Sequence, residues 1–135
     1  MNDELVPVEF AFPGALRDYL LAAIRSGTKT ATASLAREYE VGGEPLPVTG
    51  QRGTVIDSDG NGSFIIETSE VQIVRLDDVP LDHALAEGEG YESVAEWRAG
   101  HTQFWTSVAM RTELGDEFVL TGASLVVLER FIVVR

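Results

Sequence analysis

Cysteine is absent from the 135 residues, and lysine occurs once, as Lys29, while the other cationic side chains are arginines. The lack of cysteine excludes a disulfide framework, thiolate-bound zinc and thiol catalysis, and it agrees with a reducing compartment. The first residues are acidic, and no apolar run approaches the roughly 18 residues of a membrane span. We therefore expect a single soluble, cytoplasmic domain over residues 1–135, with no membrane partner.

Cations are also scarce, so the formal net charge is -12. Nucleic-acid binding depends heavily on Lys and Arg that neutralise phosphates, so this charge opposes tight binding of long polyanions. Only Arg25, Lys29, Arg37 and Arg52 gather in one part of the chain. A site for a short nucleotide fragment is expected on their side of the fold.

A helix is predicted from Pro13 to about Ser26, because proline suits the first helical turn and Gly27 follows the end. Helical spacing predicts one buried stripe and leaves three charged side chains outside it. The expected stripe is Leu16, Tyr19, Leu20, Ala23 and Ile24, and the expected exposed residues are Arg17, Asp18 and Arg25. Lys29 would then follow a firmly packed helix.

A β-hairpin is predicted in the middle of the chain, with strands from Gly53 to Asp57 and from Ser63 to Leu76. Between them lie Ser58 to Gly62, whose residue types tolerate positive φ. In the second strand the alternation of apolar residues slips by one position near Thr68 to Glu70, which predicts a bulge. A bulged strand favours a curled, barrel-like sheet in an α+β fold.

The remaining elements are predicted from spacing and end signals. Short helices are expected near Leu35 to Glu40 and Leu81 to Glu87, and a longer one from a Ser93–Glu96 capping box to about Leu114. Its expected inward side chains are Val94, Trp97, Phe104, Trp105 and Val108. Strands are expected from Glu117 to Leu120 and from Leu125 to Val134. The latter is expected to be central or covered on both faces, because it is almost continuously apolar.

Lys29 and Thr32 form the first candidate for chemistry. A buried amine that loses its proton can activate a hydroxyl nucleophile, which the always-charged arginine cannot do. Because side chains alternate along a strand, Lys29 reaches Thr32 only if this segment turns. A solvated lysine beside a structural threonine gives the same short pattern.

Glu89 is the second candidate, because Gly88 and Gly90 let the backbone around it approach another segment closely. Its carboxyl suits general acid or base catalysis, and an exposed acidic loop is the simpler alternative. His101 shares a helical face with aromatic residues, which is typical of a cleft edge or of a hydrogen-bonded core histidine. His83 is expected at the surface, and the sequence predicts no metal site.

The order of the motifs resembles the ASCH domain family over roughly Phe12 to Val134. The matching segments are Ser26 to Ser34, Glu38 to Glu40, Gly43 to Pro47, Ile66 to Thr68, Glu87 to Gly90, Trp97 and Arg98 with His101 and Phe104, and Glu129 to Phe131. Each motif is short, so the resemblance depends on the whole ordered series.

The resemblance implies a PUA-like fold, a small curled β-barrel flanked by helices, with a cleft for RNA or a nucleotide. In the compact branch that removes the acetyl group from N4-acetylcytidine, it implies Lys29, Thr32 and Glu89 as the catalytic residues. Other ASCH proteins resemble ribonucleases that act on single-stranded RNA, sometimes with the assistance of a metal. This chain is longer than the compact branch and has an extra aromatic helix, so its substrate does not follow from the fold.

These observations lead to one hypothesis and two alternatives. The hypothesis is a cofactor-free hydrolase of an acylated cytidine-like nucleoside or related amide, with Tyr39, Trp97, His101 and Arg37 as substrate-binding residues. The alternatives are a ribonuclease on single-stranded RNA and a non-catalytic module that binds RNA or a modified nucleotide.

Overall fold

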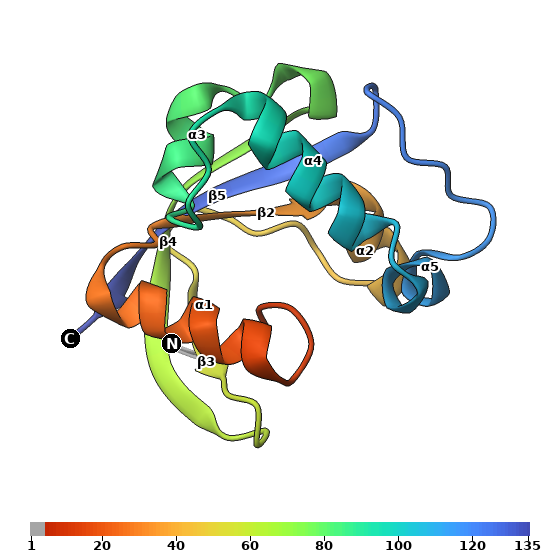
Figure 1. The fold of residues 1–135 in the computed structure, drawn as a ribbon. Coiled ribbons are helices and arrows are strands. Elements are labelled where there is room, and N and C mark those ends of the chain that lie inside the picture. The colour runs from red at the N-terminus through yellow and green to blue at the C-terminus, as the bar shows by residue number, and fades with distance from the viewer. Residues whose placement is uncertain (1–4) are drawn as a thin grey trace.

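The computed structural model describes residues 5–135, which form a five-stranded mixed sheet with helices packed around it (Figure 1). The strands are β1 (Val6–Val8), β2 (Ala31–Leu35), β3 (Arg52–Ile56), β4 (Gly62–Arg75) and β5 (Leu125–Val134). Their order is β1-β3-β4-β5-β2; β1 runs parallel to β3, and the other neighbours are antiparallel. The α+β class is confirmed, and β5 lies inside the sheet as its apolar sequence predicts.

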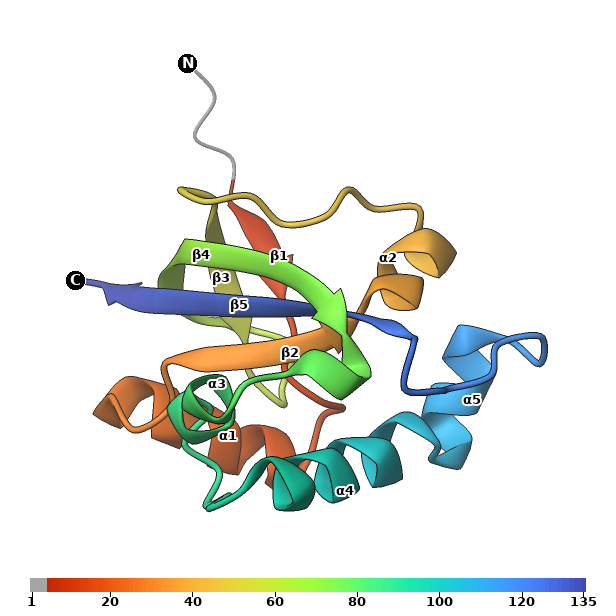
Figure 2. The ribbon, with the colours of Figure 1, turned by 90° about the horizontal axis from the view of Figure 1, so that it is seen from above.

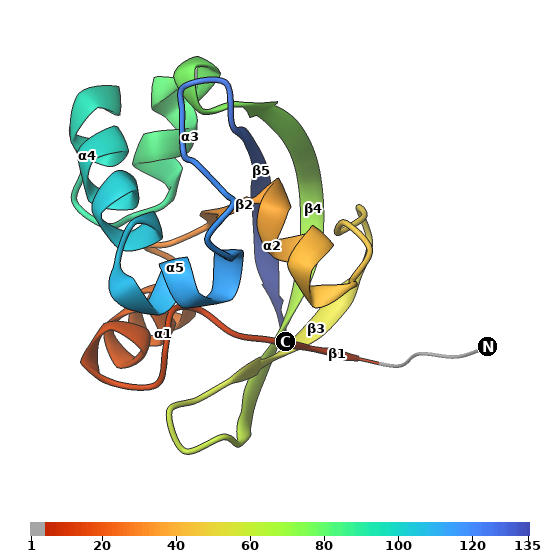
Figure 3. The ribbon, with the colours of Figure 1, turned by 90° about the vertical axis from the view of Figure 1, so that its right-hand side faces the viewer.

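Helices connect the strands, and most of them lie on one side of the sheet. They are α1 (Ala15–Ser26), α2 (Ala36–Gly42), the 3-10 helix η1 (Leu76–Asp78), α3 (Leu81–Ala86), α4 (Val94–Trp105) and α5 (Val108–Leu114). Figures 2 and 3 show α1, α3, α4 and α5 together on this side, while α2 follows the end of β2. None of the helices in residues 5–135 has the length and apolar character needed to cross a membrane.

The predicted bulge in β4 is present, because the pairing with β5 shifts register between Thr68 and Glu70. Before the shift Ile66 packs in the core beneath α1, and beyond it Val74 packs against the core beneath α4. The same strand therefore serves two cores, and it curves along its length (Figure 3). The sheet is curled as expected but open, with β1 and β2 as its edges.

Two hydrophobic cores lie against this sheet, and β5 contributes to both. Val126 and Leu128 pack with α4 and α5, whereas Phe131 packs with α1. The first core contains the fully buried Trp97 together with Trp105. Since β5 is shared, the elements around α1 and around α4 have fixed positions relative to each other.

The predicted first helix is present as α1, although it begins at Ala15 and its buried face was only partly predicted. Leu20 and Ile24 are buried as expected. Arg17 is 1% exposed, whereas Leu16 and Tyr19 are exposed. The Arg17 guanidinium donates to the carbonyls of Phe10, Ala11 and Asp57, which satisfies a charge that burial would otherwise penalise. Periodicity could not reveal these partners, because two of them lie in the non-helical segment before α1 and the third, Asp57, lies 40 residues away.

The C-terminal half differs from the prediction in two places. The expected single helix is divided at Thr106, and Ser107 caps α5 by accepting a hydrogen bond from the Met110 N–H at 3.3 Å. The break rotates Val108 to the surface, where it is 81% exposed, instead of into the core. Residues 117–120 form a loop, not the expected strand.

Candidate active site

Lys29 is positioned by the end of α1 and by the chain that follows α3. Gly27 ends the helix in the left-handed conformation, with φ 84°, and turns the chain towards β2. The Thr30 N–H then donates to the Ala86 carbonyl at 2.9 Å. This contact fixes the start of β2 against the C-terminal end of α3.

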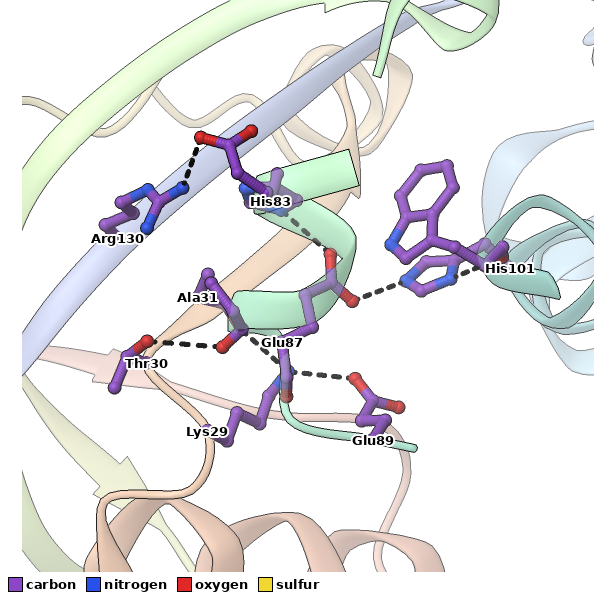
Figure 4. Close-up of polar contacts among 11 residues, drawn as sticks. Lys29, Thr30, Ala31, His83, Glu87, Glu89, His101 and Arg130 are labelled. Carbon is purple, nitrogen blue, oxygen red and sulfur yellow. Dashed lines mark hydrogen bonds and ion pairs between the residues drawn. The ribbon is translucent and has the colours of Figure 1, made fainter. Parts of the chain in front are cut away.

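The ammonium of Lys29 is buried and fully paired. Its side chain is 1% exposed, and Nζ lies 2.9 Å from Oε2 of Glu89. Nζ also donates to the carbonyls of Ala31 at 2.8 Å and Glu87 at 3.4 Å (Figure 4). The structure therefore excludes the alternative of a solvated lysine, and it brings two of the three predicted catalytic residues together.

Gly88 allows the Glu89 loop to approach Lys29. Its φ is 64°, a region that other residues rarely adopt, and a Cβ here would clash with the Thr28 carbonyl and the Lys29 Cα. The predicted close approach of the glycine-framed segment is thus observed at Gly88. Glu89 keeps 19% of its side chain exposed, so the ion pair reaches solvent through the carboxylate.

A second carboxylate, Glu87, lies behind the Lys29–Glu89 pair. Its side chain is completely buried, and Oε2 lies 2.8 Å from Nε2 of His83. Oε1 lies 3.0 Å from Nε2 of His101, but this contact is not aligned as a hydrogen bond. His83 is buried, not exposed as expected, because its ring contacts Glu87.

The histidines and the lysine keep Glu87 ionised. Burial acts to raise the pKa of Glu87, but contacts with His101 and His83 and the charge of Lys29 outweigh it and hold this pKa below its ordinary value. Burial and then the charges of Glu89 and Glu87 raise the pKa of Tyr91 to about 12. The site is therefore a compact group of alternating charges.

Thr32 does not turn back towards Lys29 as predicted, because Ala31–Leu35 is an extended strand. Within the described chain its hydroxyl has no hydrogen bond to Nζ. Nζ instead bonds the carbonyl of Ala31, which belongs to the peptide unit that leads into Thr32. Across the sheet, Thr32 pairs in register with Glu129 on β5.

Glu129 belongs to a separate polar group that includes Tyr39. The Tyr39 hydroxyl lies 3.1 Å from the Ser34 hydroxyl and donates to Glu129 at 3.4 Å; Thr68 donates to the other oxygen of Glu129 at 3.4 Å. Burial raises the pKa of both Tyr39 and Glu129. Through Glu129, this group adjoins Thr32.

The other predicted substrate-binding residues do not form one surface. Trp97 is 0% exposed and stacks on His101 with ring centroids 4.2 Å apart, so neither face is open to a base. Arg37 donates to the Leu114 carbonyl and thereby joins α2 to α5. His101 does adjoin the Lys29 group through Glu87, and Tyr39 belongs to the separate group around Glu129.

A hollow of about 460 Å³ opens beside the buried network. Its lining includes His83 and Arg130, and Arg130 contacts Asp82 at 3.3 Å (Figure 4). Since His83 also bonds Glu87, a molecule in this hollow would be one side chain away from the buried carboxylate. The sequence analysis did not identify Glu87 as part of the site, nor His83 as the residue that links Glu87 to the hollow. Their spacing of four residues, which places them on one helical face, was the available signal.

Comparison with known protein families identifies a match that covers nearly the whole chain. A family model described as "ASCH domain" matches residues 9–135. The chain belongs to the ASCH domain family. The resemblance noted from the motifs is thereby confirmed. A comparison with curated proteins found none that matches this chain.

Solved structures agree with membership in the ASCH family. A protein from Enterococcus faecalis is 27% identical, with a TM-score of 0.82 over 99% of this chain and 78% of the other. An ASCH domain from Lactobacillus crispatus is 32% identical, with a TM-score of 0.75 over 95% and 79%. A Zymomonas mobilis ASCH mutant protein is 11% identical, with a TM-score of 0.53 over 96% and 71%, and supports the fold alone.

Proposed function

We propose that this ASCH domain is a hydrolase of an acylated cytidine-like nucleoside or a related amide, with its chemistry at Lys29 and Glu89. The observation that carries the proposal is the ion pair of 2.9 Å between a buried ammonium and a partly exposed carboxylate. Acid and base catalysts must lie within hydrogen-bond reach of the groups with which they exchange protons. The burial and the short distance also favour catalysis over the alternative of a binding module.

In the resting site Lys29 is protonated, because its three hydrogen-bond partners are all acceptors. The Nζ–Oε2 contact offers a path along which one proton passes from Lys29 to Glu89 when a bound substrate excludes water. The neutral amine can then accept a proton, and the protonated carboxyl can donate one. Arginine cannot replace this function, since it does not lose its proton.

Thr32 is the proposed nucleophile. Its oxygen attacks the amide carbonyl while Lys29 accepts the hydroxyl proton, and Glu89 protonates the amine as the C–N bond breaks. Water then hydrolyses the acyl-threonine, which returns a proton to Thr32 and releases the acid. The bond from Nζ to the Ala31 carbonyl holds the amine beside the peptide unit leading into Thr32. The two side chains are not hydrogen-bonded to each other, so this step requires the Thr32 hydroxyl to reach Nζ directly or through one water molecule when substrate binds.

The decisive experiment measures deacetylation of N4-acetylcytidine by the Lys29→Arg variant. We expect turnover to fall by at least ~100-fold, the lower end of what an acid–base group contributes, while the fold is retained. The matched control is Arg25→Lys, an exchange of the same two residue types at an exposed site near the end of α1, and it should keep full activity. Undiminished turnover by Lys29→Arg would contradict the mechanism.

RNA cleavage is a weaker proposal for the same site. The net charge of -12 disfavours long polyanions, and Lys29 is already paired with Glu89. Incubation with labelled single-stranded RNA, with and without a divalent cation, separates the two activities. Cleavage without any deacetylation would favour the ribonuclease.

A further inference from the structure

Three side chains that can ligate a metal converge behind the Lys29–Glu89 pair. Glu87, Glu89 and His101 each place one ligand atom within 4.8 Å of the other two. Glu87 and Glu89 come from the chain that follows α3, and His101 comes from α4. The group therefore joins α4 to the segment that follows α3, the preceding helix in the chain.

His101 offers a lone pair to this group. Its Nδ1 lies 3.0 Å from the Trp97 carbonyl, and since a carbonyl only accepts, Nδ1 carries the proton. Nε2 of the neutral ring is then an acceptor. A hydrogen bond from one ring nitrogen to a backbone carbonyl is also the arrangement that orients metal-binding histidines.

Glu87 places a second acceptor against this nitrogen. Its Oε1 is buried without an aligned hydrogen bond and lies 3.0 Å from His101 Nε2. Two facing acceptors repel each other unless a cation lies beside them, and a buried unpaired carboxylate oxygen is costly. A second proton on His101 or a metal ion would remove this cost.

The separation of the two atoms suits a shared metal. Two ligands at about 2.1 Å from one ion lie about 3.4 Å apart at the tetrahedral angle that zinc prefers and about 3.0 Å apart at 90°. The observed distance from Oε1 to Nε2 is 3.0 Å, so neither side chain needs to move far. Glu89 bonds Lys29 through Oε2, so an ion would share the Glu89 carboxylate with the Lys29 ammonium.

Charge and packing also favour a cation. Glu87 and Glu89 carry two negative charges, and Lys29 contributes one positive charge. The His101 ring is held by stacking on Trp97 and by an edge contact with Trp105 at 5.1 Å between centroids. A fixed imidazole with two carboxylates is a donor set that suits Zn²⁺ or Mn²⁺ better than Ca²⁺.

We propose that Glu87, Glu89 and His101 bind one divalent transition-metal ion of the Zn²⁺ or Mn²⁺ type. The ion would lie beside Lys29 and tie α4 to the loop after α3. This proposal does not depend on amide hydrolysis, because binding is measured without any substrate. Loss of deacetylation with intact metal binding would therefore remove only the proposed function.

Titration calorimetry with Zn²⁺, Mn²⁺ and Ca²⁺ tests the site directly. We expect the protein to bind one Zn²⁺ or Mn²⁺ ion per chain and to bind Ca²⁺ more weakly. Glu87→Gln and His101→Ala should each lower the affinity for the ion by at least about 100-fold. This loss exceeds the roughly 10–100-fold loss that is typical when a residue outside the ligand set is changed. Glu117→Gln, a change of the same type in an exposed loop, should bind as the wild type does. Equal affinity in all these proteins would overturn the proposal.

A measurement on the wild-type protein covers the case in which the variants do not fold. Mn²⁺ should broaden the NMR signals of the Gly88, Gly90 and Gly100 amides at substoichiometric amounts and leave that of Gly60, in the β3–β4 turn, sharp. Zn²⁺ should shift the Nε2 resonance of His101. If His101 instead carries protons on both ring nitrogens near neutral pH and neither ion affects these signals, the second proton replaces the metal and the proposal is wrong.

Discussion

At the scale of the residue, the site depends on what surrounds Lys29. Its ammonium has carboxylate and carbonyl partners and almost no contact with water. The neighbouring Glu87 bonds His83 through one oxygen, and its other oxygen faces Nε2 of His101 at 3.0 Å. These contacts make each charge tolerable in the interior and couple the groups, so a change at one of them should alter the others.

Gly88→Ala should destabilise the protein by about 2–4 kcal/mol, because positive φ and contact with the Thr28 carbonyl both oppose a Cβ. Urea unfolding measures this loss. Gly60→Ala is the control, since Gly60 has φ +85° but nothing within 4 Å of its added Cβ. It should cost only about 1 kcal/mol for the strained backbone. Equal losses would show that the close approach of the two segments is unimportant.

At the scale of the element, the division of α4 from α5 decides which side chains are buried. Ser107 accepts from the Met110 N–H and starts α5 in a new direction. Met110 and Leu114 are therefore buried, while Val108 is exposed. A continuous helix would have placed Val108 on the inward stripe.

Met110→Ala should cost about 2–5 kcal/mol, as expected for a large side chain removed from a core. Val108→Ala should change stability by less than about 0.5 kcal/mol, because Val108 is 81% exposed. Thermal and urea unfolding of the two variants provide the comparison. A loss above 2 kcal/mol for Val108→Ala would favour the continuous helix that the sequence predicted.

At the scale of the whole molecule, buried carboxylates link stability to pH with opposite signs. The contacts of Glu87 lower its pKa in the folded state from the ordinary 4.5, so its contribution is present above pH 4.5 and is lost as the pH falls below that value. Burial raises the pKa of Glu129 above 4.5. The contribution of Glu129 is thus present below pH 4.5 and is lost as the pH rises through its folded pKa.

Glu87→Gln should destabilise the metal-free protein by about 3–5 kcal/mol near neutral pH, because it breaks a buried ionic group. The difference from wild type should shrink as the pH falls below 4.5, where the unfolded carboxyl gains its proton. Glu129→Gln should show the reverse trend, gaining on the wild type as the pH rises. Urea unfolding across the acid range, with a chelator present, checks both; parallel profiles would contradict the linkage.

The sequence by itself determined the elements whose signals are local. The first helix follows from a proline start and a glycine end, the β3–β4 hairpin from its turn residues, and the bulge near Thr68 from a slip in alternation. The apolar run of β5 fixed its central place in the sheet. Lys29 and Glu89 were also predicted from the sequence, through their residue types, glycine neighbours and family resemblance.

Only the tertiary structure decided which charged groups lie inside and with which partners. Arg17 is buried because backbone carbonyls accept its hydrogen bonds, His83 is buried against Glu87, and Trp97 is closed to substrate because His101 stacks on it. Thr32 lies on an extended strand because β5 pairs with it, which no local signal showed. Periodicity records which side chains avoid water, but it does not show whether a polar partner stabilises a buried charge.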